Sequence, residues 1–130
     1  MRGFVPLVLA LIALPVVALA VVRAFSSRAG LKARIVYLAT SVCAAWTSIW
    51  KTSNVVYFTD PNQRVHGWPL PWVIWQRKDA DSAWLDYVGL ITLLAYPLNM
   101  AIFVAVPSVV FLAYCNLKSR QKSAGTIPMP

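Results

Sequence analysis

Three long apolar runs limit what this chain can fold into, because each has the length of a helix that crosses a lipid bilayer. The first run, 4–22, contains nineteen residues and no charge. As a helix it extends about 28 Å, which matches a bilayer hydrocarbon core of about 30 Å. The second run, 35–58, is interrupted only by Lys51, whose ammonium group can extend to the interface. Both runs are therefore predicted to span a membrane.

The third run, 84–117, is too long for one straight crossing, since its thirty-four residues would extend about 50 Å as a helix. Dividing it at Pro97 would leave only thirteen residues in the first part, fewer than the roughly 17 that a span needs. We therefore expect a single transmembrane helix over 84–116, kinked at Pro97 and Pro107.

The composition agrees with a membrane domain. Apolar residues make up 59% of the chain and charged residues 12%, whereas a soluble domain has about 25% charged residues. The 130 residues leave no room beside three spans for a separate soluble domain of ordinary size. We expect one all-α integral membrane domain over 1–130, with three transmembrane helices and a Trp/Pro-rich extracytoplasmic loop.

The charges predict how this domain is oriented. The net charge of +8 lies outside the middle of the chain, mainly in the loop 23–34 and the tail 118–130. All four acids lie within that middle: Asp60, Asp79, Asp81 and Asp86. Because basic loops stay on the cytoplasmic side, we expect the N-terminus and segment 59–83 outside and the C-terminus in the cytoplasm of a bacterium, with the protein in the inner membrane. The tail lacks apolar periodicity and is predicted to be loosely ordered.

A cleaved signal peptide is the alternative for the first run, because Arg2, an apolar stretch and an Ala18-Leu19-Ala20 sequence resemble its three regions. Cleavage would leave a basic mature N-terminus to be translocated, against the positive-inside bias. An uncleaved anchor is the preferred interpretation.

The most distinctive segment is the Trp/Pro-rich loop around residues 65–75. Proline at 69 and 71 removes backbone donors, so we expect no helix before Trp72. The loop is interpreted as an interfacial anchor or, alternatively, as an exposed platform for a partner subunit, a lipid or a pigment. The candidate binding residues are His66, Trp68, Pro69, Pro71, Trp72 and Trp75. A single histidine without neighbouring ligands does not predict a metal site, and we expect no cofactor.

Polar groups inside the apolar runs are candidate contacts between helices. Lys51 and Asp86 fall near the outer ends of their runs, which suggests an ion pair, and Asn99 near the centre of the third run is expected to bond a neighbouring helix or a carbonyl freed by Pro97. Small residues also recur every four positions in the second run, at Ala39, Cys43 and Thr47 among others. They allow close helix packing, within the chain or against a different subunit.

These features favour a non-catalytic accessory, assembly or scaffold subunit of a larger membrane protein complex, with lipids and other subunits as partners. The chain lacks the short motifs of nucleophilic, phosphate-binding or metal-dependent enzymes, so we expect no enzyme. Nucleic-acid binding is not expected either, because the basic residues flank membrane spans. The alternatives are a small homo-oligomeric carrier or channel, with Lys51, Asp86 and Asn99 along its pathway, and an immunity or stress protein.

Overall fold

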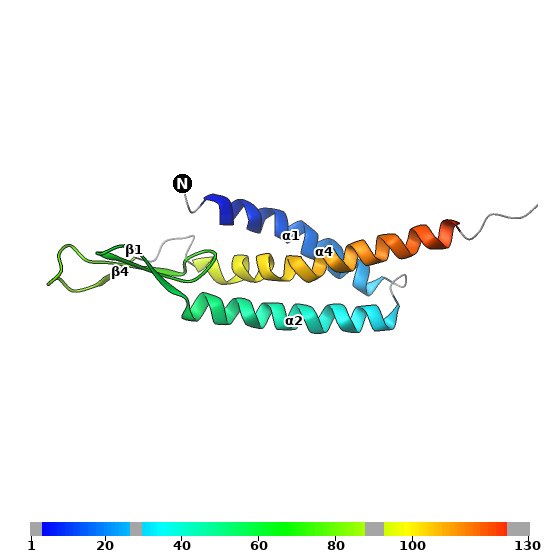
Figure 1. The fold of residues 1–130 in the computed structure, drawn as a ribbon, viewed down its shortest axis with the longest axis horizontal. Helices are drawn as coiled ribbons and strands as arrows, with labels where there is room; N and C mark the ends of the chain where they lie inside the picture. Colours follow the sequence, from blue (N-terminus) through cyan, green and yellow to red (C-terminus); the bar gives the residue numbers. More distant parts are fainter. Residues whose placement is uncertain (1–3, 27–29, 88–92, 125–130) are drawn as a thin grey trace, which may run out of the picture.

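The structure, a computed structural model, describes residues 4–26, 30–87 and 93–124. In chain order the elements are α1 (Phe4–Phe25), α2 (Leu31–Asn54), β1 (Val56–Asp60), β2 (Gln63–His66), β3 (Val73–Gln76), β4 (Leu85–Tyr87) and α4 (Ala95–Ala124). The helices lie side by side, and the sheet extends from one end of the bundle along the same long axis (Figure 1). We call the end of the bundle next to the sheet the sheet end. The opposite end, where α1 ends, α2 begins and α4 ends, is called the basic end.

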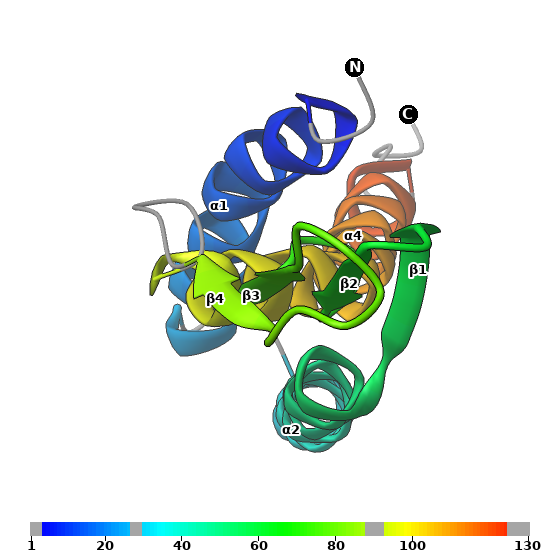
Figure 2. The ribbon, with the colours of Figure 1, turned by 90° about the vertical axis from the view of Figure 1, so that its left-hand side faces the viewer.

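Helix α4 is the centre of the bundle, since α1 and α2 pack mainly on α4 rather than on each other (Figure 2). Towards the basic end the contacts use small residues of α1, Ala20 and Ala24, which are buried and let α4 approach closely. There the ring of Tyr37 stacks on Phe111 with centroids 4.6 Å apart. The Tyr37 hydroxyl also forms a 3.1 Å hydrogen bond with Ser108 Oγ, which joins α2 to α4.

The four strands form an antiparallel sheet in chain order, β1-β2-β3-β4. Arg77 fixes its far end, because the guanidinium donates hydrogen bonds to Asn62 Oδ1, to the Pro61 carbonyl and to the Ala80 carbonyl at 2.9–3.1 Å. The same guanidinium lies 4.7 Å from the ring centroid of Trp84, and that of Arg64 lies 4.4 Å from it. The Trp84 ring is thus held by two cations, an arrangement that favours order in a sheet this small.

Two helical segments are long and apolar enough to cross a membrane, Val5–Phe25 and Ala95–Gln121. Most of each segment is not buried inside the protein, so neither resembles the core helix of a soluble domain. Helix α2 is not one of the two. The fold is therefore mostly helical, with two candidate membrane-spanning helices and a small sheet.

The expectation of an all-α chain was wrong, because a sheet occupies much of the segment 56–87. Its strands are rich in β-branched and aromatic residues, which pack well on a pleated surface. The residues 56–58 of β1 and 85–87 of β4 were expected to belong to helices because of their hydrophobicity, whereas β2 and β3 lie in the segment that was expected to be a loop. The second run, 35–58, therefore ends as a helix at Asn54 and continues as β1, and the third run, 84–117, begins with β4.

The expectations for the third helix and the tail also need correction. The helix begins at Ala95, so Pro97 lies in its first turn, where a missing N–H removes no helical hydrogen bond. Pro107 alone lies in the interior. At the other end α4 continues to Ala124, so 118–124 is helical rather than loosely ordered. Residues 125–130 and Arg2 lie outside the described residues.

Candidate functional site

The Trp/Pro-rich loop turns back onto the end of the bundle between β2 and β3. Gly67 makes this turn possible: its φ is +103°, and a Cβ there would lie 3.0 Å from the Leu70 carbonyl oxygen. The Gly67 N–H donates to the Val55 carbonyl at 2.8 Å, and the Trp72 N–H donates to the His66 carbonyl at 2.9 Å. The segment is not helical before Trp72, as its prolines predicted.

Leu70, at the tip of the loop, is inserted into the bundle and is 1% exposed. It packs against two buried alanines, Ala10 of α1 and Ala95 of α4. Trp72 and Leu98 border the same cluster. Burying one leucine side chain contributes about 1.5–3 kcal/mol, so the loop is anchored by a side chain that the sequence analysis did not single out.

Asn99 holds the backbone of this leucine. The fully buried Asn99 side chain accepts the Leu70 N–H at Oδ1 (2.9 Å) and donates from Nδ2 to the Leu70 carbonyl (2.9 Å). The amide oxygen and the amide nitrogen of Asn99 thus bond both backbone groups of Leu70, as the backbone of a neighbouring β-strand would. Asn99 Nδ2 also donates to Thr52 Oγ1 at 3.0 Å, and one amide therefore joins the loop, α4 and α2. We call these three residues the Asn99 clamp.

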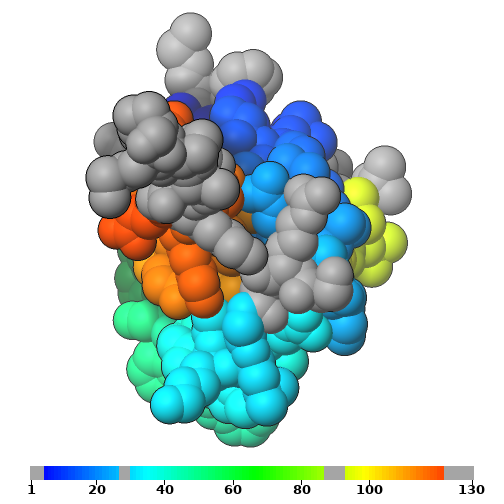
Figure 3. Space-filling model, turned by 90° about the vertical axis from the view of Figure 1, so that its right-hand side faces the viewer, coloured from blue at the N-terminus to red at the C-terminus, as the bar shows by residue number. Residues whose placement is uncertain are grey.

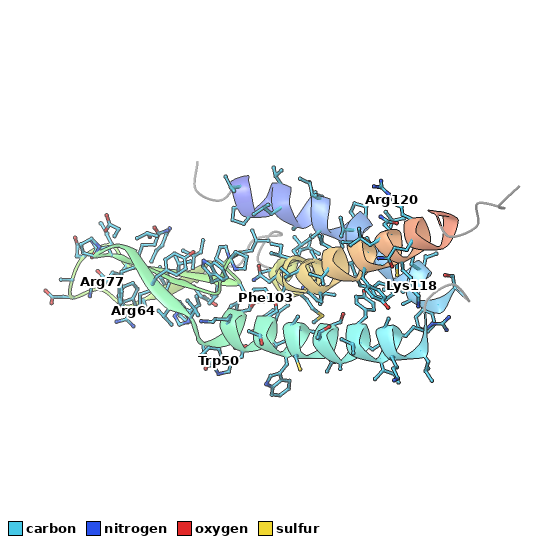
Figure 4. All side chains as sticks on the ribbon, turned by 45° about the vertical axis from the view of Figure 1, so that its right-hand side comes forward. Trp50, Arg64, Arg77, Phe103, Lys118 and Arg120 are labelled. Carbon is cyan, nitrogen blue, oxygen red and sulfur yellow. The ribbon has the colours of Figure 1, made fainter. Side chains whose placement is uncertain are left out.

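Aromatic rings surround the clamp. Trp72 and Tyr96 have ring centroids 6.0 Å apart, and the Tyr96 hydroxyl forms a 3.0 Å hydrogen bond with Ser53 Oγ of α2. Trp68 meets Phe103 of α4 edge to face, also at 6.0 Å, yet remains 51% exposed. Figure 4 shows Phe103 on the part of α4 near the sheet. The loop is therefore partly buried against the helices, rather than a fully exposed platform.

The remaining predicted residues are not members of the Asn99 clamp. His66 and Trp75 lie in β2 and β3, and both are partly buried. The ammonium of Lys51 lies 5.3 Å from the ring centroid of Trp50, whereas Asp86 is exposed in β4. Within the described ranges, no ion pair joins Lys51 to Asp86. Pro69 and Pro71 are partly buried in the loop.

Asn99 bonds a neighbouring helix, as its chemistry predicted, but its depth was misjudged. Because α4 begins at Ala95, Asn99 lies in the second turn, at the sheet end, and not near the centre of a span. Its partner Leu70 could not be identified from the sequence, since a backbone amide carries no signature. Thr52 gave only the weak signal of a hydroxyl residue at the end of an apolar run.

A second candidate surface is the side of α2 that faces away from α4. Ala39, Cys43 and Thr47 are all exposed there, and Thr47 Oγ1 donates to the Cys43 carbonyl at 2.8 Å. On the same side Trp46 is 72% exposed and Trp50 is 54% exposed, and Figure 4 shows Trp50 directed away from the bundle. We call these five residues the outer face of α2.

Within the part of the chain that the structure describes, no group of three His, Cys, Asp or Glu side chains is placed to hold a metal ion. Comparison with known protein families, curated proteins and solved structures found no match.

Proposed function

We propose that this protein is a non-catalytic accessory, assembly or scaffold subunit of a larger membrane protein complex, and that it binds its partner through the outer face of α2. In this proposal all three helices cross a bacterial cytoplasmic membrane. The sheet lies on the outer side, and the basic end lies in the cytoplasm.

The observation that carries the proposal is that the outer face of α2 is uncovered. Packing within the chain would have buried Ala39, Cys43 and Thr47, yet all three are exposed and flanked by two exposed tryptophans. Small residues let a second helix approach closely in a membrane, and tryptophan is the residue most enriched at binding hot spots. Helix α2 is also not one of the two segments that are long and apolar enough to cross a membrane by themselves, which agrees with a helix that packs against other protein.

The distribution of charge supports the orientation. Arg23, Lys118 and Arg120 lie at the basic end, where Arg23 donates to Asn116 Oδ1 at 2.6 Å. The acids Asp60 and Asp86 lie in the sheet at the opposite end. This polarity agrees with a positive side that remains in the cytoplasm.

The Asn99 clamp fixes the position of the sheet relative to the helices, as a scaffold requires. Since Leu70 is bound by one α4 side chain that also bonds α2, the sheet is attached to the two helices through buried contacts. A partner that binds the outer face of α2 would therefore meet the sheet in a constant position. No comparable arrangement favours the carrier: both polar atoms of the Asn99 amide are engaged, and the described residues show no Lys51–Asp86 pair.

The test compares Cys43→Phe with Leu19→Phe, a matched control at a 60% exposed position of α1. Both variants add an aromatic ring to an exposed helix position, but only the first blocks the outer face of α2. We expect the wild type and Leu19→Phe to be extracted in mild detergent as a large assembly with other polypeptides, and Cys43→Phe to be released from it. Resistance to alkaline carbonate extraction verifies that each variant is inserted.

Two results would contradict the proposal. One is a Cys43→Phe variant that stays in the assembly as firmly as the control. The other is a wild type that migrates alone. If it migrates instead as an assembly of identical chains, the homo-oligomeric carrier becomes the better hypothesis and transport assays decide.

A further inference from the structure

A groove lies between α2 and α4 near the basic end, with a volume of about 600 Å³. This volume falls within the range of about 300–1,000 Å³ that is typical of small-molecule sites. Its walls are almost entirely apolar, with Val36 and Tyr37 on α2 and Val110 and Phe111 on α4. Val36 and Val110 are more than 60% exposed, so the groove opens sideways, towards the surroundings of the bundle.

The mouth of the groove is positively charged. Among the described residues that line the groove, Lys32 is the one charged residue. The Lys118 ammonium lies 6.0 Å from the ring centroid of Tyr114, another lining residue, and 3.7 Å from the position that a Cβ on Gly30 would occupy. Gly30 is the N-cap of α2 and provides no side-chain cap. Figure 4 shows Lys118 on the side of α4 that faces α2, and Figure 3 shows the start of α2 (cyan) beside the orange part of α4 at this end.

This arrangement of charges and helix terminus would stabilise an anion. The N-terminus of a helix carries a partial positive charge and unpaired N–H groups, which anions stabilise and cations do not. Here Lys32 belongs to the first turn of α2 and the Lys118 ammonium lies near Gly30, whereas all four acids of the chain lie in 60–86, towards the other end. An anion at this position would be attracted by both lysines and by the amides of the first turn.

We infer that the groove binds an anionic phospholipid, with the phosphate between Lys32, Lys118 and the N-terminus of α2 and one acyl chain along the apolar walls. The inference rests on the membrane location in the proposed function. A lipid is the occupant that combines the two halves of the site, since a free anion would leave Val36, Val110 and their neighbours uncovered. Tyr114 also lines the groove, and amphipathic aromatic rings of this kind are enriched where a membrane protein meets lipid headgroups.

The experiment titrates the purified full-length protein in detergent with phosphatidylglycerol or with phosphatidylcholine of the same acyl chains, and counts bound lipids by native mass spectrometry. We expect phosphatidylglycerol to bind about tenfold tighter or more. Each lysine near an anionic headgroup contributes about 1 kcal/mol, so the Lys32→Gln/Lys118→Gln double variant should bind it about 30-fold more weakly. Arg120→Gln is the matched control, because Figure 4 places Arg120 on the other side of α4.

A second variant tests the apolar half. Val110→Trp fills the groove from the α4 side at an exposed position, so the fold should tolerate it. It should lower the binding of both lipids while leaving helical content and the unfolding temperature unchanged. Inorganic phosphate and glycerophosphoglycerol, which lack acyl chains, should not compete at the concentrations at which the lipid binds.

Three results would overturn the inference: equal binding of the two lipids, equal losses in Arg120→Gln and the double lysine variant, or undiminished binding in Val110→Trp. Effective competition by inorganic phosphate would assign the lysines to a free anion instead. Because binding is measured on the isolated chain, failure here leaves the subunit proposal intact. Loss of the assembly in Cys43→Phe, conversely, does not alter the expected lipid preference.

Discussion

Replacing Asn99 by leucine should detach the Trp/Pro-rich loop from the bundle. The substitution keeps the approximate volume but removes three buried hydrogen bonds, two to the Leu70 backbone and one to Thr52 Oγ1. Each donor or acceptor left buried without a partner costs about 1–3 kcal/mol. The loop lies at the end of the bundle and can move to regain water, so we expect a total loss of about 2–4 kcal/mol rather than the full sum.

Two measurements detect this loss of stability. Unfolding in mixed micelles, monitored by tryptophan fluorescence, gives the free energy, and hydrogen exchange of the Leu70 amide gives the local opening. Thr52→Val is the matched control, since it removes only the bond to Asn99 Nδ2 and should cost about 0.5–1.5 kcal/mol without exposing the Leu70 N–H. If Leu70 remained equally protected in Asn99→Leu, or if stability fell by less than about 0.5 kcal/mol, the clamp would not hold the loop.

Two further predictions concern the sheet end. Gly67→Ala should destabilise the turn by at least about 1–3 kcal/mol, because alanine at a φ of +103° is strained and its Cβ would meet Trp72 and Leu70 at 3.0 Å. In the control Gly30→Ala, the new Cβ would meet only the Lys118 ammonium at 3.7 Å, so melting curves should separate the two variants. Burial raises the pKa of Tyr57 above its usual 10.0, so the folded state favours the neutral phenol. The contribution of this phenol to the stability of the fold is therefore fully present below pH 10 and falls as the pH rises further. A Tyr57→Phe variant should therefore lose less stability above pH 10 than the wild type, and equal losses would rule out a role for this hydroxyl.

Hydrophobicity was a reliable guide where a run was apolar throughout. The first run, 4–22, became α1 although it contains several valines, because an uninterrupted apolar run of this length is far longer than an ordinary strand and fits a helix. The other runs contained a change of structure that hydrophobicity does not record. Val56 and Tyr57 are as apolar as the helix before them, yet β-branched and aromatic residues favour strands, and pairing with β2 satisfies their backbone groups. Attention to residue type within the run would have located the first strand.

The site was predictable only in part, for a different reason. Asn99 stood out because a buried amide in an apolar run must find partners. Its partner is a backbone group of Leu70, twenty-nine residues away, and any residue type at position 70 would have offered the same N–H. Leu70 itself resembles the other apolar residues of the loop. The Lys51–Asp86 pair failed for a related reason, because it assumed two helix ends at one level, and Asp86 is in a strand.

The two proposed surfaces both use α2, but at different levels. The groove takes its α2 wall from 32–40, next to the basic end, whereas the outer face of α2 extends from Ala39 to Trp50, towards the sheet. They meet near residues 39–40, where a bound acyl chain would end beside the partner. If both proposals hold, filling the groove by Val110→Trp should leave the assembly intact, since that residue lies on α4. If lipid instead completes the partner's binding surface, Val110→Trp and Cys43→Phe should release the partner alike, and added phosphatidylglycerol should strengthen the wild-type assembly in detergent.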